Sequence, residues 1–207
     1  IDAAGNESES FTTAGPFSNT GQYRAIISLD PPTNFFADSD LSEWAHIVPF
    51  EVRPESNPVQ GTIDNAADFS YDAYVAMDET YLYVAFHVLD DHFVSSEADT
   101  INWWDNEGIE FYFGLYELGI PHPYFMHGVE PDYRLVFLPD WVHLSKASYG
   151  EWDLELSEDD YIFVDLGGSD YIIEARIPFS TMIDEDENVF IPTQGMTIPF
   201  EILGFDT

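Results

Sequence analysis

The stretch Tyr81-Leu82-Tyr83-Val84-Ala85-Phe86-His87-Val88 decides the fold class of this chain. Leucine, valine and phenylalanine occupy every second position, and tyrosine, alanine and histidine stand between them. Successive side chains of a β-strand point to opposite sides, so this alternation predicts a strand over Tyr81–Asp90 with one face in the core and tyrosines on the other. The short acidic turn Asp78-Glu79-Thr80 precedes it and is suited to a β-hairpin.

Short alternating runs of the same kind recur from about residue 34 to the end, separated by Asp, Asn, Gly and Pro. Helical periodicity is nearly absent. Together with Tyr81–Asp90, the clearest runs are 72–78, 108–116, 133–138, 161–166, 171–177 and 196–205. Seven or more short strands at this spacing predict an all-β domain built as an antiparallel β-sandwich of the jelly-roll type.

The charge balance excludes some partners. The chain has 207 residues, with Lys+Arg 5 against Asp+Glu 40, a net charge of −35 at pH 7 and a pI near 4.1. So few cations cannot neutralise a run of phosphates, which excludes nucleic acid, and the field repels anionic lipid. Two interpretations of the acidity stay open and are compatible, namely a surface adapted to salt (halophilic) and the binding of cations.

The beginning of the chain differs from the rest. Residues 1–30 are rich in Gly, Ser, Thr and Asn and are predicted to be a linker, whereas residues 31–207 form the sandwich domain. Ile1-Asp2-Ala3-Ala4-Gly5-Asn6-Glu7-Ser8 resembles the last strand of a fibronectin type III domain, which implies a neighbouring domain of that kind in a multidomain, secreted or cell-surface protein. No run approaches the roughly 20 apolar residues of a membrane span, so membrane insertion is not expected.

Four phrases in order resemble the family 9 carbohydrate-binding modules. They are FADSDLSEW at 36–44, AMDETYLYVAF at 76–86 followed by Asp90-Asp91, WDNEGIEFYF at 104–113, and YIIEARIPF at 171–179. Glu107 stands where the family usually has aspartate. The resemblance spans roughly residues 34–207 and implies a non-catalytic domain that binds an oligo- or polysaccharide.

The resemblance also implies which residues hold the sugar. Trp104 matches a stacking tryptophan of the family, whose indole packs on the apolar face of a pyranose. Glu110, Arg134 and Glu174 each stand inside a strand, and we expect them to meet on one sheet face and to bond sugar hydroxyls, or else to form a structural ion network. The family's second stacking tryptophan falls beyond Thr207, so Trp141 and Trp152, which flank a predicted loop, are the substitute candidates.

Structural calcium is implied by the same resemblance. Calcium takes six to eight oxygen ligands, and paired carboxylates in turns supply them. The candidate ligands are Asp38, Asp40, Asp90, Asp91 and Asp206. In a chain with 40 acidic residues, some such pairs arise by chance.

The sequence also bears on three functions other than sugar binding. Catalysis is not expected, because the chain lacks the H-E-x-x-H zinc motif and the G-x-S-x-G nucleophile turn. A structural or adhesive module of a cell surface or filament, stiffened by calcium, is the main alternative. Haem-binding electron transfer is the other, since similar sandwich domains bind haem b, and its candidate residues are Met77, Met126 and His127.

Overall fold

The computed structural model describes residues 26–53, 63–93, 107–115, 133–146, 150–182 and 190–205. Within these ranges the chain forms β-strands and two short 3-10 helices, and no α-helix. The strands are β1 (Phe50–Val52), β2 (Phe69–Met77), β3 (Tyr81–Asp90), β4 (Gly108–Phe113), β5 (Tyr133–Leu138), β6 (Trp141–Lys146), β7 (Gly150–Leu154), β8 (Tyr161–Asp165), β9 (Tyr171–Pro178) and β10 (Phe200–Phe205), and the helices are η1 (Leu41–Trp44) and η4 (Phe179–Thr181).

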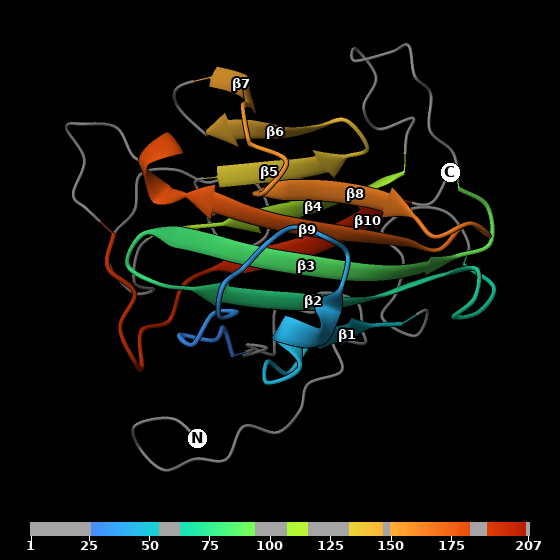
Figure 1. Cartoon of the computed structure of the whole chain (residues 1–207), viewed down its shortest axis with the longest axis horizontal. Coiled ribbons are helices and arrows are strands. Elements are labelled where there is room, and N and C mark those ends of the chain that lie inside the picture. Colours follow the sequence, from blue (N-terminus) through green and yellow to red (C-terminus); the bar gives the residue numbers. More distant parts are fainter. Residues whose placement is uncertain are drawn as a thin grey trace, which may run out of the picture.

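The strands form two five-stranded sheets that lie one behind the other (Figure 1). The first sheet has the order β1-β2-β3-β9-β8, and the second has the order β10-β4-β5-β6-β7. Every strand pair is antiparallel. The predicted antiparallel β-sandwich is therefore confirmed. Among the described residues, no helix has both the length and the apolar character that a membrane crossing requires.

The main core lies between the two sheets. Leu82, Val84, Phe86 and Val88 of β3 are fully buried there, as their alternation predicted. Facing side chains come from β4, β5 and β6 of the second sheet, among them Phe111, Phe137 and Leu144. Full burial of a large apolar side chain contributes on the order of 2 kcal/mol, so this double layer of rings and branched chains is the main source of stability.

A second, smaller core covers the outer face of the first sheet. The segment before β1 crosses this face, and its buried Phe35, Ala37, Trp44 and Ile47 pack on Ala76, Tyr83 and Ala85. At the start of this segment the backbone of Ser28 bonds to Val75 and Met77 of β2. The last residues of the predicted linker thus contact the sandwich.

The sequence placed most strands well and missed three. The predicted bounds of β3 and β5 match the structure, and those of β2, β4, β8, β9 and β10 overlap it. β1, β6 and β7 were not predicted. The prediction of a loop that contains His143 and Lys146 is wrong, because both residues lie in β6, which pairs with β7; the third predicted loop residue, Tyr149, lies outside the described residues.

Candidate functional site

A polar cluster lies on the outer face of the second sheet. Glu110 and Tyr112 of β4 face Arg134 of β5, and Arg134 pairs with Ser145 of β6 in the strand register. The Tyr112 hydroxyl donates to Glu110 Oε2 at 2.6 Å, Arg134 Nε donates to Ser145 Oγ at 2.9 Å, and Arg134 Nη1 lies 3.9 Å from Glu110 Oε1. These four residues are called the Glu110 cluster below.

The Glu110 cluster is almost entirely shielded from water. Glu110 and Tyr112 are each 3% exposed, and the Arg134 side chain is 12% exposed. Burial, together with the hydrogen bond to Glu110, raises the pKa of Tyr112 well above its ordinary value. The tyrosine therefore stays a neutral hydrogen-bond donor, and it fixes the carboxylate beside the guanidinium group.

Glu174 does not join this cluster, so the prediction that it meets Glu110 and Arg134 on one sheet face is wrong. It lies on β9, in the other sheet, and points outward beneath the segment that carries Trp44. Its carboxylate accepts hydrogen bonds from Trp44 Nε1 at 2.9 Å and from the backbone N–H groups of Asp38 and Ser39. Burial raises the pKa of Glu174 to about 7 against the opposing effect of these donors. In the structure, Glu174 joins the segment before β1 to the first sheet through these hydrogen bonds.

The tryptophan candidates have different outcomes. Trp104 lies outside the described residues, and so does the side chain of Trp152, whose backbone pairs with Leu144. Trp141 is half-buried at the start of β6, on the same face as the Glu110 cluster. Its ring lies edge-on to His143, with centroids 5.5 Å apart and an interplanar angle of 89°.

Two of the predicted calcium ligands, Asp38 and Asp40, already accept hydrogen bonds from the backbone. Among the described residues, no group of three or more acidic or histidine side chains converges to hold a metal ion. Asp38 Oδ1 accepts the N–H of Asp40, and Asp40 Oδ1 caps η1 through Ser42 N. Both carboxylates therefore stabilise the local turn in which they stand. Asp91 is exposed, and Asp206 lies outside the described ranges.

Asp90 lies near a second buried carboxyl group, that of Glu107. Asp90 is 3% exposed, Glu107 is fully buried, and the two side chains influence each other's protonation. Burial raises the pKa of Asp90, and its Oδ2 atom has no hydrogen-bond partner. Two neighbouring buried acids need a shared proton or a cation.

One of the three haem candidates, Met77, lies in the described part of the chain. Met77 is 2% exposed and packs in the main core, so it is not placed to bind haem, whereas Met126 and His127 lie outside the described residues.

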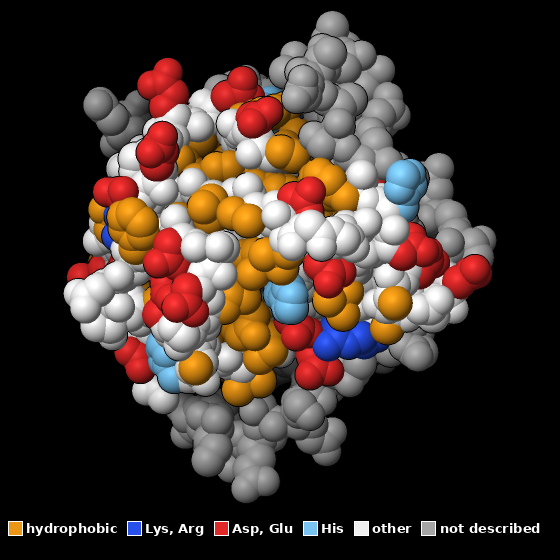
Figure 2. All heavy atoms as spheres, turned by 45° about the vertical axis from the view of Figure 1, so that its right-hand side comes forward, with side chains coloured by type: hydrophobic (Ala, Val, Ile, Leu, Met, Phe, Trp, Pro, Cys, Tyr) orange, Lys and Arg blue, Asp and Glu red, His pale blue; other side chains and the backbone are white. Residues whose placement is uncertain are grey.

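Figure 2 shows acidic side chains spread over the visible face with few Lys or Arg side chains among them.

Sequence reasoning missed Tyr112, Glu107 and Trp44 as neighbours of the buried carboxylates, and Ser145 as the acceptor for Arg134. Tyr112 could have been found, because it stands two residues after Glu110 and so faces the same side of the strand. Glu107 differs from the family phrase, but this difference alone does not indicate that it lies near Asp90. Trp44 lies 130 positions from Glu174, and nothing in the pattern connects them.

Comparisons with curated proteins and with solved structures gave different results. No curated protein matches the sequence. Two similar solved structures are a carbohydrate binding module family 9 from Caldicellulosiruptor kristjanssonii in complex with glucose (15% identity, TM-score 0.44) and in complex with cellotriose (16% identity, TM-score 0.45). Each covers 85% of this chain, and the matches span 74% and 73% of those chains.

A family comparison is more decisive, because it covers most of the chain. The sequence model described as "Carbohydrate family 9 binding domain-like" matches residues 43–207. This range contains every strand that the structure describes, and it includes the whole Glu110 cluster. The chain therefore belongs to the carbohydrate family 9 binding domain-like family, whose members are non-catalytic carbohydrate-binding modules.

Proposed function

We propose that this domain is the carbohydrate-binding part of a larger extracellular protein and that it holds a glycan on the outer face of the second sheet. The observation that carries the proposal is the Glu110 cluster, in which Tyr112 and Ser145 fix a carboxylate and a guanidinium group side by side. Charged groups form stronger bonds to sugar hydroxyls than neutral groups do. A site held in place in advance loses less entropy on binding.

In this proposal the aromatic part of the site is Trp104, with its indole against the apolar face of the sugar. Trp104 precedes β4 by a few residues, and Glu110 follows on the strand itself. Trp152 stays a further candidate. Binding through a tethered domain would raise the local concentration of a glycan near the neighbouring domains, which is what a non-catalytic module contributes to a larger protein.

Isothermal titration of the domain with a panel of mono- and oligosaccharides tests the proposal. Glucose and cellotriose belong in the panel, because the two similar structures hold them. We expect binding that is abolished or weakened at least about tenfold by Glu110→Gln, Arg134→Met and Trp104→Ala. Arg53→Met is the matched control, since it removes the same charge as Arg134→Met but lies at the end of β1 in the other sheet.

The main alternative predicts a different result. If the Glu110 cluster is only a structural ion network, no sugar produces heat, and Arg134→Met lowers the midpoint of thermal unfolding instead. That outcome would favour a structural or adhesive module. Titration heats that are equal in wild type and Glu110→Gln would remove the proposed site while leaving sugar binding by the domain intact.

A further inference from the structure

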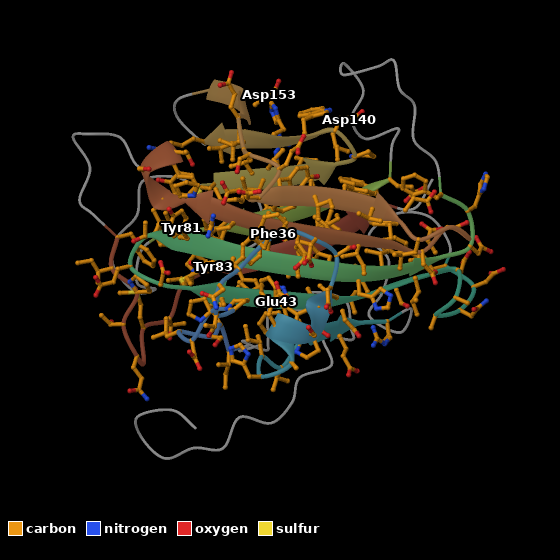
Figure 3. All side chains as sticks on the ribbon, viewed as in Figure 1. Phe36, Glu43, Tyr81, Tyr83, Asp140 and Asp153 are labelled. Carbon is orange, nitrogen blue, oxygen red and sulfur yellow. The ribbon has the colours of Figure 1, made fainter. Side chains whose placement is uncertain are left out.

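A second aromatic and polar group lies on the same face as the Glu110 cluster. It consists of Trp141 and His143 on β6 and Asp153 on β7, and it is called the Trp141 edge below. His143 Nδ1 and Asp153 Oδ1 are 2.9 Å apart, and the indole of Trp141 lies edge-on to the His143 ring. Figure 3 shows Asp153 with Asp140 at the end of the molecule near β6 and β7, away from Phe36 and Glu43 over the first sheet.

Exposure differs between the two groups. Trp141 is half-buried and the Asp153 side chain is 68% exposed, whereas Glu110 and Tyr112 are each 3% exposed and the side chains of His143 and Arg134 are 13% and 12% exposed. A ligand that reaches this face from water therefore meets Trp141 and Asp153 before the more deeply buried Glu110 cluster. Trp141 and Asp153 together present an aromatic ring on which a sugar can stack and a carboxylate that can accept hydrogen bonds.

The strand register gives the distance between the groups. Glu110, Val136, His143 and Asp153 are successive partners across β4, β5, β6 and β7. Neighbouring strands are about 4.8 Å apart, so Glu110 and Asp153 lie roughly 14 Å apart along the sheet. One pyranose ring is too short to contact both ends of this row, and a chain of two or three rings is long enough.

From this arrangement we infer that the Trp141 edge is a second sugar contact and that the ligand is an oligosaccharide lying across strands β4 to β7. The inference rests on the proposed function. Trp141 packs on the apolar face of one sugar unit, while the exposed carboxylate of Asp153 bonds its hydroxyls. Asp153 holds the His143 ring and His143 packs against Trp141, so the contact is ordered before the sugar arrives.

The test compares a single sugar with a trisaccharide. Wild type and Trp141→Ala are titrated with glucose and cellotriose, or with the monosaccharide and trisaccharide of another sugar that the panel selects. We expect Trp141→Ala to weaken trisaccharide binding roughly tenfold and to leave monosaccharide binding within about twofold, because one stacked ring is lost at a site that a monosaccharide does not need. Trp141→Phe should restore part of the trisaccharide affinity and guards against misfolding.

Phe36→Ala is the matched control, since Phe36 is an aromatic side chain 49% exposed over the other sheet. Equal losses for both sugars in Trp141→Ala would overturn the inference, because Trp141 would then belong to a single shared site. Unchanged trisaccharide binding would overturn it too, while a loss in Glu110→Gln would keep the proposed function. A wild-type domain that binds no sugar overturns both.

Discussion

At the scale of single residues, Glu174 is the side chain whose chemistry the fold changes most. It is fully buried, and its carboxylate is held by the indole N–H of Trp44 and by two backbone N–H groups. Its folded pKa of about 7 lies above the ordinary value of 4.5. The folded state therefore binds the proton more tightly than the unfolded chain does, and the stability this contributes is present below pH 4.5 and lost as the pH rises through 7.

We therefore expect the free energy of unfolding to decrease between pH 5 and pH 8 through Glu174, by at most about 3 kcal/mol. Glu174→Gln should remove that part of the decrease, since the amide does not titrate. Urea unfolding across this pH range, followed by tryptophan fluorescence, measures it. Glu79→Gln is the control, because Glu79 is an exposed acid in the hairpin turn. Equal slopes in wild type and Glu174→Gln would contradict the assignment.

At the scale of elements, the segment before β1 is fixed to the first sheet by Trp44. Trp44→Phe keeps most of the apolar volume of the small core and removes the donor to Glu174 Oε1. We expect a loss of about 1–3 kcal/mol in the free energy of unfolding, because a buried acceptor is left unsatisfied. The loss should be larger at pH 8 than at pH 5, since the ionised carboxylate needs the donor more. A pH-independent loss would show that Trp44 acts through packing alone.

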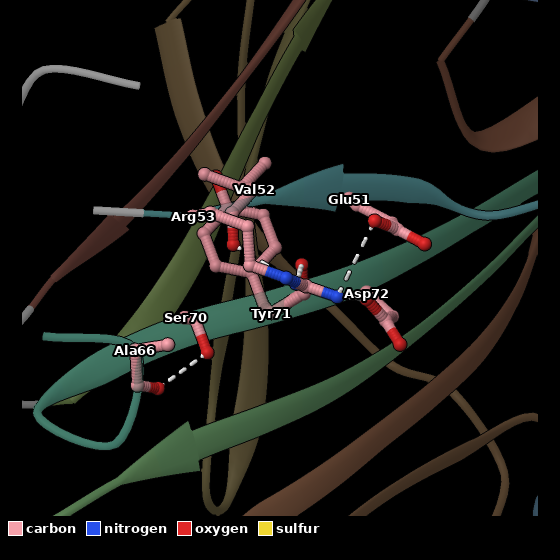
Figure 4. Close-up of polar contacts among 7 residues, drawn as sticks. All are labelled: Glu51, Val52, Arg53, Ala66, Ser70, Tyr71 and Asp72. Atoms are coloured by element: carbon pink, nitrogen blue, oxygen red, sulfur yellow. Dashed lines mark hydrogen bonds and ion pairs between the residues drawn. The ribbon is translucent and has the colours of Figure 1, made fainter. Parts of the chain in front are cut away.

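The edge strand β1 depends on a second anchor, Arg53 (Figure 4). Its Nη1 donates to the carbonyls of Val52 and Tyr71 at 3.0 and 2.9 Å, and its Nη2 contacts Asp72 at 2.5 Å and Glu51 at 3.7 Å. We expect Arg53→Met to lower the opening free energy of the β1 amides by about 1–2 kcal/mol, measured by hydrogen exchange. Glu51→Gln should have almost no effect, since that longer pair is exposed to solvent. Equal protection in Arg53→Met would contradict the anchor.

Elements were predictable where large apolar side chains alternated with small or polar ones. In β3 the alternation of Leu82, Val84 and Phe86 was enough to give both ends of the strand. In β6, Val142 and Leu144 alternate in the same way, but Trp141, His143 and Lys146 between and beside them suggested a polar loop. The partners of Glu174 could not be predicted, because a hydrogen bond across 130 positions follows from how the segment before β1 crosses the sheet.

At the scale of the whole molecule, the net charge of −35 opposes compaction. Sodium chloride should therefore raise the free energy of unfolding, since at about 0.1 M salt screens carboxylate repulsion beyond roughly 10 Å. Thermal unfolding across a salt series measures the effect. Stability that is constant or falls over the series would show that the acidic surface carries no net repulsion in the fold.

We propose that calcium acts differently from this general screening, by binding between Asp90 and Glu107. These carboxyl groups are buried together, and an ion that neutralises both removes the cost of burying their charge. At constant ionic strength, we expect calcium at about 1 mM to raise the midpoint of thermal unfolding of the wild type and to leave that of Asp90→Asn unchanged. Asp38→Asn is the control, since Asp38 bonds within its own turn, and it should keep the response. If sodium and calcium at matched ionic strength gave the same midpoint in the wild type, the pair would instead share a proton, and stability would fall as the pH rises and removes it.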